Sequence, residues 1–100
     1  MAELRVSPEA EAELDDIWLY LARESGSIDV ANRVIDKITE RLWLLARYPY
    51  LGQARDEDLR PGLRTFPVDG YVIVHRLDDN DVVLVLHVVP PGRNIGTLIG

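Results

Sequence analysis

The first residues of the chain alternate between apolar and polar, and the next repeat with helical spacing. Leu4 and Val6 are separated by one polar residue, so residues 2–6 are expected to form a short strand. A helix is expected to begin at Ser7-Pro8, because serine caps helix N-termini and proline suits the first helical turn. The apolar residues that follow recur three or four positions apart and would share one helix face: Ala10, Leu14, Ile17 and Leu21.

A second helix is expected after a break of three small residues. Ser25-Gly26-Ser27 ends the first helix and begins the next. Tyr48-Pro49 ends the second helix, because the residue before a proline is kept out of helical backbone angles. So short a connection predicts an antiparallel helical hairpin. The apolar stripe of the second helix consists of Ala31, Val34, Ile35, Ile38, Leu42 and Leu45.

Beyond the second helix, the pattern changes to short segments rich in β-branched residues. Residues 49–61 are expected to be a surface loop, and Asp69-Gly70 is a strong signal for a two-residue β-hairpin turn. Pro90-Pro91-Gly92 ends the last strand, which leaves a tail (residues 93–100) with no expected strand or helix to bury its apolar side chains. The expected strands are Leu63–Val68, Tyr71–Leu77 and Val82–Val89.

Taken in order, these elements predict an α+β fold with the arrangement β-α-α-β-β-β in a single domain that spans residues 1–100. The helical hairpin is expected to pack on one face of a small, mostly antiparallel sheet. The long connection after the first strand is expected to return that strand to pair beside a later one.

The composition narrows the possible functions. The 100 residues carry a net charge of −6, and affinity for nucleic acid normally comes from a basic surface, so direct nucleic-acid binding by this chain is not expected. The absence of cysteine excludes disulfides and thiol catalysis and fits a reducing compartment. No apolar run approaches the roughly 18 residues of a membrane span, and the N-terminus lacks the features of a signal peptide. A cytoplasmic protein without membrane contact is expected.

The sequence gives little indication of a catalytic or cofactor site. His75 and His87 have the chemistry of general bases near neutral pH. Each is nevertheless expected to be an ordinary strand residue facing solvent or a partner, because no other ligand or triad residues lie at suitable spacing. Glycines near the C-terminus do not follow a strand into a helix, as a phosphate-binding loop requires. No metal and no cofactor are therefore expected.

Four arginines flank the expected C-terminal strands: Arg60, Arg64, Arg76 and Arg93. If they converge at one end or edge of the sheet, they would suit a phosphate group or an acidic protein surface. Alternatively, they are solvated or pair internally with nearby acids. The candidate acids are Asp56, Asp58 and Asp69.

Several large apolar residues lie off the helix stripes. At 100° per residue, Leu19 lies nearly opposite the first stripe and Trp18 flanks it, while Trp43 and Leu44 lie well off the second stripe. They serve either the contact between the two helices or an exposed apolar patch of the kind that marks protein interfaces.

The stretch from Tyr48 to Leu77 carries a distinctive series of short motifs. It contains an aromatic-Pro-x-Leu-Gly turn, a Leu-Arg pair, a Gly-Leu-Arg triplet and a Tyr-x-Ile strand. These motifs, together with the helix from Ser7 to Ser25, resemble the toxin subunits of the ParE/RelE superfamily of bacterial type II toxin–antitoxin modules over nearly the whole chain. Pro90-Pro91 stands where many members have a histidine before Gly-Arg. The matching motif positions are Tyr48, Pro49, Leu51, Gly52, Leu59, Arg60, Gly62, Leu63, Arg64, Tyr71 and Ile73.

The resemblance implies a toxin whose ParD-like antitoxin folds a disordered C-terminal arm over it. The acidity of the chain predicts basic side chains on that arm. RelE-like members cut mRNA in the ribosomal A site, whereas ParE-like members inhibit DNA gyrase and are not known as nucleases. The net charge of −6 and the lack of a late Tyr-His or Arg-Tyr pair favour the ParE-like, non-enzymatic function.

Two alternatives stay open. A ribosome-dependent endoribonuclease would use Arg64, Arg76, His87 and Arg93 as phosphate contacts and acid or base. A degenerate toxin would have only a structural role in its complex.

Binding residues follow from these expectations. Arginines at strand or loop ends and the apolar residues of the tail are predicted to contact the target, and the large apolar residues off the helix stripes are predicted to contact the antitoxin. The target-binding set is Arg60, Arg64, Arg93, Ile95, Leu98 and Ile99, and the antitoxin-binding set is Trp18, Leu19, Trp43 and Leu44.

Overall fold

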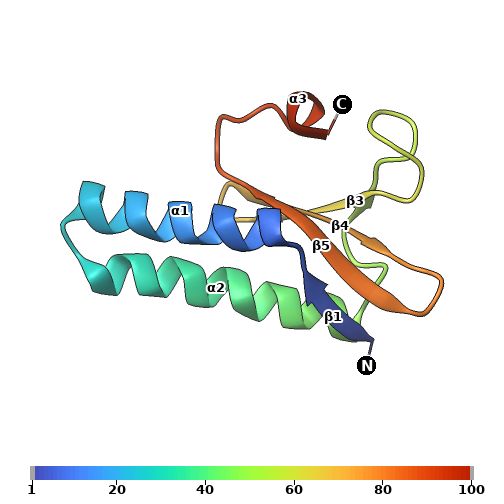
Figure 1. The fold of residues 1–100 in the computed structure, drawn as a ribbon, viewed down its shortest axis with the longest axis horizontal. Coiled ribbons are helices and arrows are strands. Elements are labelled where there is room, and N and C mark those ends of the chain that lie inside the picture. The colour runs from blue at the N-terminus through green and yellow to red at the C-terminus, as the bar shows by residue number, and fades with distance from the viewer. Residues whose placement is uncertain (1, 100) are drawn as a thin grey trace.

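The computed structural model describes residues 2–99, with only the backbone described for Ile99. Two long helices pack against one mixed sheet of five strands, in the order β1-β5-β4-β3-β2 (Figure 1). This arrangement confirms the predicted α+β fold. The strands are β1 (Glu3–Val6), β2 (Gln53–Ala54), β3 (Arg64–Val68), β4 (Tyr71–Leu77) and β5 (Val82–Val89), and the helices are α1 (Pro8–Ser25), α2 (Ile28–Arg47) and α3 (Ile95–Ile99).

Serine caps begin both long helices, as predicted. The Ser7 hydroxyl accepts a hydrogen bond from the Ala10 N–H at 3.0 Å and donates one to the Leu86 carbonyl at 2.8 Å. One side chain therefore fixes both the start of α1 and its position against β5. Ser27 accepts the Val30 N–H at 3.3 Å in the same way at the start of α2.

The strand pairing also follows the predicted scheme. The first strand returns to the sheet, where β1 pairs in parallel with β5 and places Val6 opposite Val85. The other pairs are antiparallel. Asp69 and Gly70 both have positive φ, at 49° and 86°, which is the conformation of a tight two-residue hairpin turn.

Two short elements were not predicted. β2 lies inside the expected surface loop, where Gln53 and Ala54 pair with Thr65 and Arg64. The expectation that the tail has no strand or helix is wrong, because Ile95–Ile99 forms α3. The residues of β2 are exposed and have no strand pattern of their own, so β2 forms only through its pairing with β3. Ile95 of α3 packs against the buried cluster on the open face of the sheet.

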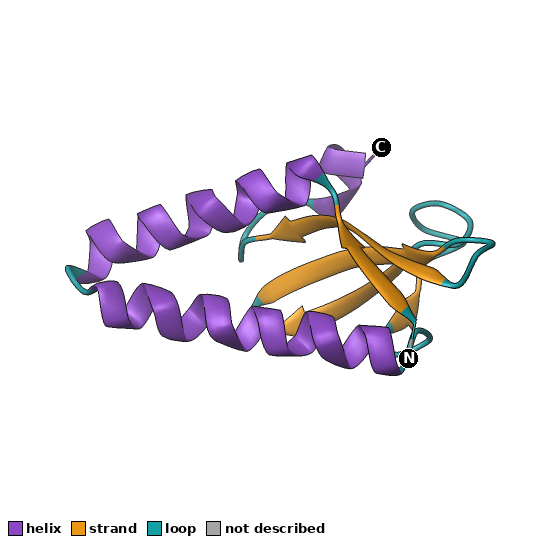
Figure 2. Ribbon diagram, turned by 60° about the horizontal axis from the view of Figure 1, so that its bottom comes forward, coloured by secondary structure: helices purple, strands orange, loops and turns teal. Residues whose placement is uncertain are grey.

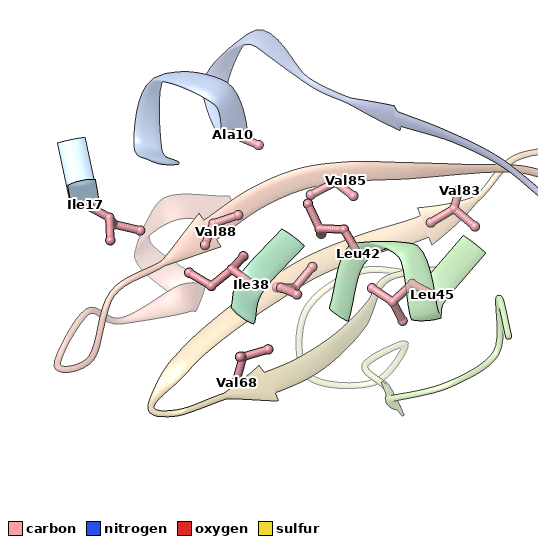
Figure 3. Packing of buried hydrophobic residues seen from close by; sticks show 10 residues of the cluster. Ala10, Ile17, Ile38, Leu42, Leu45, Val68, Val83, Val85 and Val88 are labelled. Carbon is pink, nitrogen blue, oxygen red and sulfur yellow. The ribbon is translucent and has the colours of Figure 1, made fainter. Parts of the chain in front are cut away.

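The main core lies between the helical hairpin and the sheet (Figure 3). Ile38 and Leu45 of α2 share this core with Val83 and Val85 of β5, and all four side chains are fully buried. Each such side chain contributes about 1.5–3 kcal/mol by leaving water. This packing holds β5 against the second long helix.

The opposite face of the sheet carries a smaller apolar cluster. Leu63, Val74 and Val89 are buried there, and Leu59 and Ile95 pack against them. The loop before β3 and the helix α3 thus cover part of the face that the helical hairpin leaves open.

The tip of the helical hairpin extends past the sheet. In Figures 1 and 2, the connection between α1 and α2 lies well beyond the ends of the strands. Ile28, at the start of α2, is 60% exposed there. The distal turns therefore have a surface that a partner protein can reach.

Candidate functional site

A hollow of about 600 Å³ lies where α1 meets the ends of β4 and β5. We call it the α1 hollow. It combines carboxylates, two tyrosines, two prolines and an arginine, which suits recognition of a polar group with an apolar stem. Its lining consists of Glu13, Asp16, Ile17 and Tyr20 from α1, Tyr71 from β4, and Pro90, Pro91, Arg93 and Leu98 from the chain after β5.

Glu13 covers an open stretch of sheet edge beside this hollow. β1 pairs only with the Val82–Val85 part of β5, so the outer edge beyond Val85 has no strand beside it. The Glu13 carboxylate accepts the Val88 N–H at 3.0 Å and lies 3.2 Å from His87 Nδ1. Glu13 therefore satisfies a backbone donor that would otherwise be left unpaired, and it orients the imidazole of His87.

The other polar groups of the α1 hollow are available. Within residues 2–99, neither Asp16 nor the side chain of Arg93 forms a hydrogen bond or ion pair. Tyr20 is 64% exposed, while Tyr71 is half-buried. Burial, and then the nearby Tyr20, raises the pKa of the Tyr71 hydroxyl, so Tyr71 remains a neutral donor at physiological pH.

A second cluster lies at the opposite end of β4. Arg64 of β3 pairs in register with His75, and its Nη2 donates to the carbonyls of Tyr50 and Gly52 at 2.6 and 2.9 Å. The guanidinium also lies over the Tyr50 ring, 5.8 Å from its centre. Arg64 thus holds the loop after α2 against the sheet edge.

The expectation that His75 faces solvent or a partner is wrong. Its side chain is fully buried, and in the described part of the chain neither ring nitrogen has a hydrogen-bond partner. Burial, and secondarily the charge of Arg64, lowers the pKa of His75 to about 4, so the ring is neutral at pH 7. A side chain sealed in this way does not reach a substrate.

The arginines do not converge at one end of the sheet. Arg64 lies level with His75, and Arg76 is the next residue along β4. Arg93 follows Val89, which pairs with Val72 toward the other end of β4. Arg60 is exposed in the loop before β3.

The candidate acids have other contacts in this structure. Asp58 binds Arg55 through Nε at 2.8 Å, and Asp69 binds Lys37 at 2.7 Å. Asp56 accepts the Gly62 N–H at 2.7 Å. The acids thus stabilise the loop before β3 and tie α2 to the β3–β4 turn.

The predicted antitoxin residues divide between two surfaces. Trp18 is half-buried and donates from Nε1 to Asn32 Oδ1 at 2.8 Å, so it joins α1 to α2. Leu19 is 42% exposed on α1. Trp43, 57% exposed, and half-buried Leu44 line a smaller hollow of about 260 Å³ on α2, flanked by Glu40 and Arg47.

The tail residues predicted to bind a target also differ in position. Ile95 packs against the cluster on the open sheet face, whereas Leu98 is 38% exposed and lines the α1 hollow. The side chain of Ile99 lies outside the described residues. Leu98 is therefore the described apolar tail residue with an accessible position in a hollow.

The α1 hollow was not predicted from the sequence. Glu13, Asp16 and Tyr20 belong to an ordinary polar helix face, and they meet Tyr71 only through the packing of α1 on β5. The role of Glu13 could have been inferred from the strand lengths. The four residues of β1 are too few to pair with all eight residues of β5, so part of the β5 edge needs another hydrogen-bond partner.

Two further observations concern metal binding and membrane spans. In residues 2–99, no group of three or more His, Cys, Asp or Glu side chains has an arrangement able to hold a metal ion. The described helices include none with the length and apolar character needed to cross a membrane.

Comparisons with known proteins agree with this geometry. Residues 4–95 match the family model for the ParE toxin of the type II toxin–antitoxin system parDE. The chain is 32% identical to toxin ParE3 of Caulobacter vibrioides over 97% of its own length and 93% of that protein. It is also 32% identical to toxin ParE1 of the same organism, over 87% of this chain and 90% of that one. The solved chromosomal ParDE system from P. aeruginosa contains a chain with a TM-score of 0.78 and 22% identity, which covers 91% of this chain and 97% of that one.

Proposed function

The chain belongs to the ParE toxin family of type II toxin–antitoxin systems, and we propose that it inhibits DNA gyrase by binding, without catalysis, and is neutralised by a ParD-like antitoxin. Both interactions would take place in the cytoplasm. The remaining alternatives are a ribosome-dependent endoribonuclease and a degenerate toxin.

The separation of the arginines that a nuclease would need around His87 is the observation that most favours binding over catalysis. A nuclease needs an acid or base that reaches the phosphate and ribose of its substrate, together with cations placed around it. His75 is sealed in the interior, and Arg64 and Arg93 lie toward different ends of the sheet. The net charge of −6 adds a repulsive term for any approach to RNA.

We propose that the target is bound by the residues predicted from the sequence, and the structure suggests an order in which to test them. Arg93 and Leu98 are accessible in the α1 hollow and are the first to test. Arg60 is exposed, and Arg64 has part of its guanidinium committed to the loop after α2. Ile95 supports α3 from beneath, so it would act by positioning the tail.

For the antitoxin, we propose a helix that covers the outer faces of α1 and α2. Trp43 is more than half exposed, and large aromatic residues of this kind are typical anchors of protein interfaces. Leu44 shares its hollow, and Leu19 supplies a second apolar contact on α1. Trp18 would contribute by keeping the two helices together.

The test is to induce the chain alone in a bacterial host and to assay the purified protein against gyrase. Binding to gyrase predicts filamentation, an SOS response and cleaved DNA, with translation continuing at first. We expect Arg93→Ala combined with Leu98→Ala to weaken inhibition of supercoiling by about tenfold or more, and the matched variant His87→Gln to retain it.

Other outcomes would overturn the proposal. Rapid arrest of translation with cuts in ribosome-bound mRNA, abolished by His87→Gln, would identify a nuclease. Normal growth after induction, with the purified chain folded and no effect on gyrase, would identify a structural subunit without toxicity.

A further inference from the structure

The α1 hollow has the features of a binding site for a guanidinium group. We propose that it receives an arginine side chain from the C-terminal arm of the antitoxin. This inference rests on the proposed function, because it assumes an antitoxin, but it assigns a contact away from Trp43 and Leu44.

The charge of α1 favours a basic occupant. From Pro8 to Ala22 the helix has no basic residue, and its first base is Arg23. A cation approaching this face is attracted by all of the neighbouring carboxylates. The acidic residues of this segment are Glu9, Glu11, Glu13, Asp15 and Asp16.

Asp16 is the carboxylate with free acceptor capacity in the hollow. Glu13 already accepts the Val88 N–H and contacts His87, whereas Asp16 has no polar contact within the described residues. The one basic residue of the lining, Arg93, forms no ion pair with either carboxylate in residues 2–99. The carboxylates are therefore not neutralised from within the chain.

The walls of the hollow suit the rest of an arginine side chain. Tyr20 and Tyr71 come from different elements and lie near one another, so their rings can flank a planar cation. Ile17, Pro90 and Pro91 supply apolar surface for the aliphatic stem. A guanidinium forks to a carboxylate through two parallel hydrogen bonds, which a lysine ammonium does not reproduce.

The experiment measures antitoxin affinity by calorimetry, with the antitoxin that co-purifies with the chain as the probe. We expect Asp16→Lys to weaken binding by about tenfold or more, and the matched variant Asp15→Lys by less than about threefold, because Asp15 does not line the hollow. Tyr20→Ala should weaken binding by about tenfold, with the exposed Tyr48→Ala as its control.

A charge exchange identifies the residue on the partner. Replacing each arginine of the antitoxin arm with aspartate, one at a time, should yield one variant that binds the Asp16→Lys toxin better than wild-type antitoxin does. If no arginine variant does so, the proposed arginine contact is wrong. Circular dichroism and thermal unfolding of each toxin variant verify that it is folded, since the altered positions are exposed.

The outcomes separate this inference from the proposed function. If Asp16→Lys and Tyr20→Ala bind the antitoxin normally while Trp43→Ala does not, the antitoxin is real and the α1 hollow is not its site. If the wild-type chain dimerises and Asp16→Lys breaks only the dimer, the hollow belongs to an interface between two copies and the inference fails. If no antitoxin binds the wild-type chain, both proposals fail.

Discussion

Replacing His75 with leucine is expected to remove a large part of the acid sensitivity of the fold. The imidazole is fully buried, and its pKa in the folded protein is about 4, against 6.5 for an exposed histidine. Between these values the unfolded chain binds a proton that the folded chain does not. The free energy of unfolding should therefore fall as the pH decreases from about 6.5 toward 4, by about 3 kcal/mol in total.

The assay is urea unfolding of wild type and His75→Leu between about pH 7 and pH 4.5. At pH 7 the two proteins should differ by no more than about 1 kcal/mol, because leucine removes two unpaired buried nitrogens at similar volume. At the acid end, wild type should have lost about 2 kcal/mol more than the variant. Asp58 and Asp78, whose pKa values are lowered by hydrogen bonds, destabilise both proteins alike on acidification and cancel in the comparison.

Equal losses in the two proteins would refute this reasoning and would place His75 in contact with water. His75→Ala is the less useful variant, because the cavity it leaves costs about 2–5 kcal/mol at every pH. The same argument changes how toxicity data must be interpreted. Loss of killing by His75→Ala would report a damaged core, so it would not identify a catalytic histidine.

The remaining predictions concern the loop after α2 and its support. Gly52→Ala should destabilise the protein by at least about 2 kcal/mol in thermal unfolding, because φ is +97° and a Cβ would lie 2.6 Å from the Thr65 carbonyl oxygen. Gly26→Ala, with φ +67° but open space around it, should cost only about 1 kcal/mol. Arg64→Ala should cost about 2–3 kcal/mol in urea unfolding through the loss of two hydrogen bonds to loop carbonyls, and Arg93→Ala should stay within about 0.5 kcal/mol of wild type.

The elements of this fold were predictable where the signal is local. Ser7-Pro8 and Ser25-Gly26-Ser27 set helix ends by capping, and Asp69-Gly70 sets a hairpin by its backbone preference. β2 and α3 were missed because no local pattern specifies them. Gln53–Ala54 is a strand only through its pairing with β3, a contact between segments about ten residues apart.

The candidate sites were less predictable, for two different reasons. His75 lies two residues after the buried Ile73, so alternation along β4 places both side chains on the face toward the helices. The expectation that His75 faces solvent or a partner came from the polarity of its ring. The register between β4 and β5 also shifts at this point, because Val74 pairs with His87 and His75 with Val85, which leaves Leu86 of β5 as an extra residue that the sequence pattern does not predict. The α1 hollow arises differently, since it forms from helix and strand residues that only tertiary packing brings together.

The α1 hollow places the two proposed contacts of this toxin on one surface. Arg93 and Leu98, proposed to reach the target, line the same hollow as Asp16 and Tyr20, proposed to hold the antitoxin. An arm seated there would exclude a target from those residues by occupying the same volume, and neutralisation would follow from direct competition. Gyrase and antitoxin should then displace one another in a pull-down with the purified chain. A ternary complex that forms without loss of either partner would place the target contact elsewhere, with Arg60 in the loop before β3 as the next residue to test.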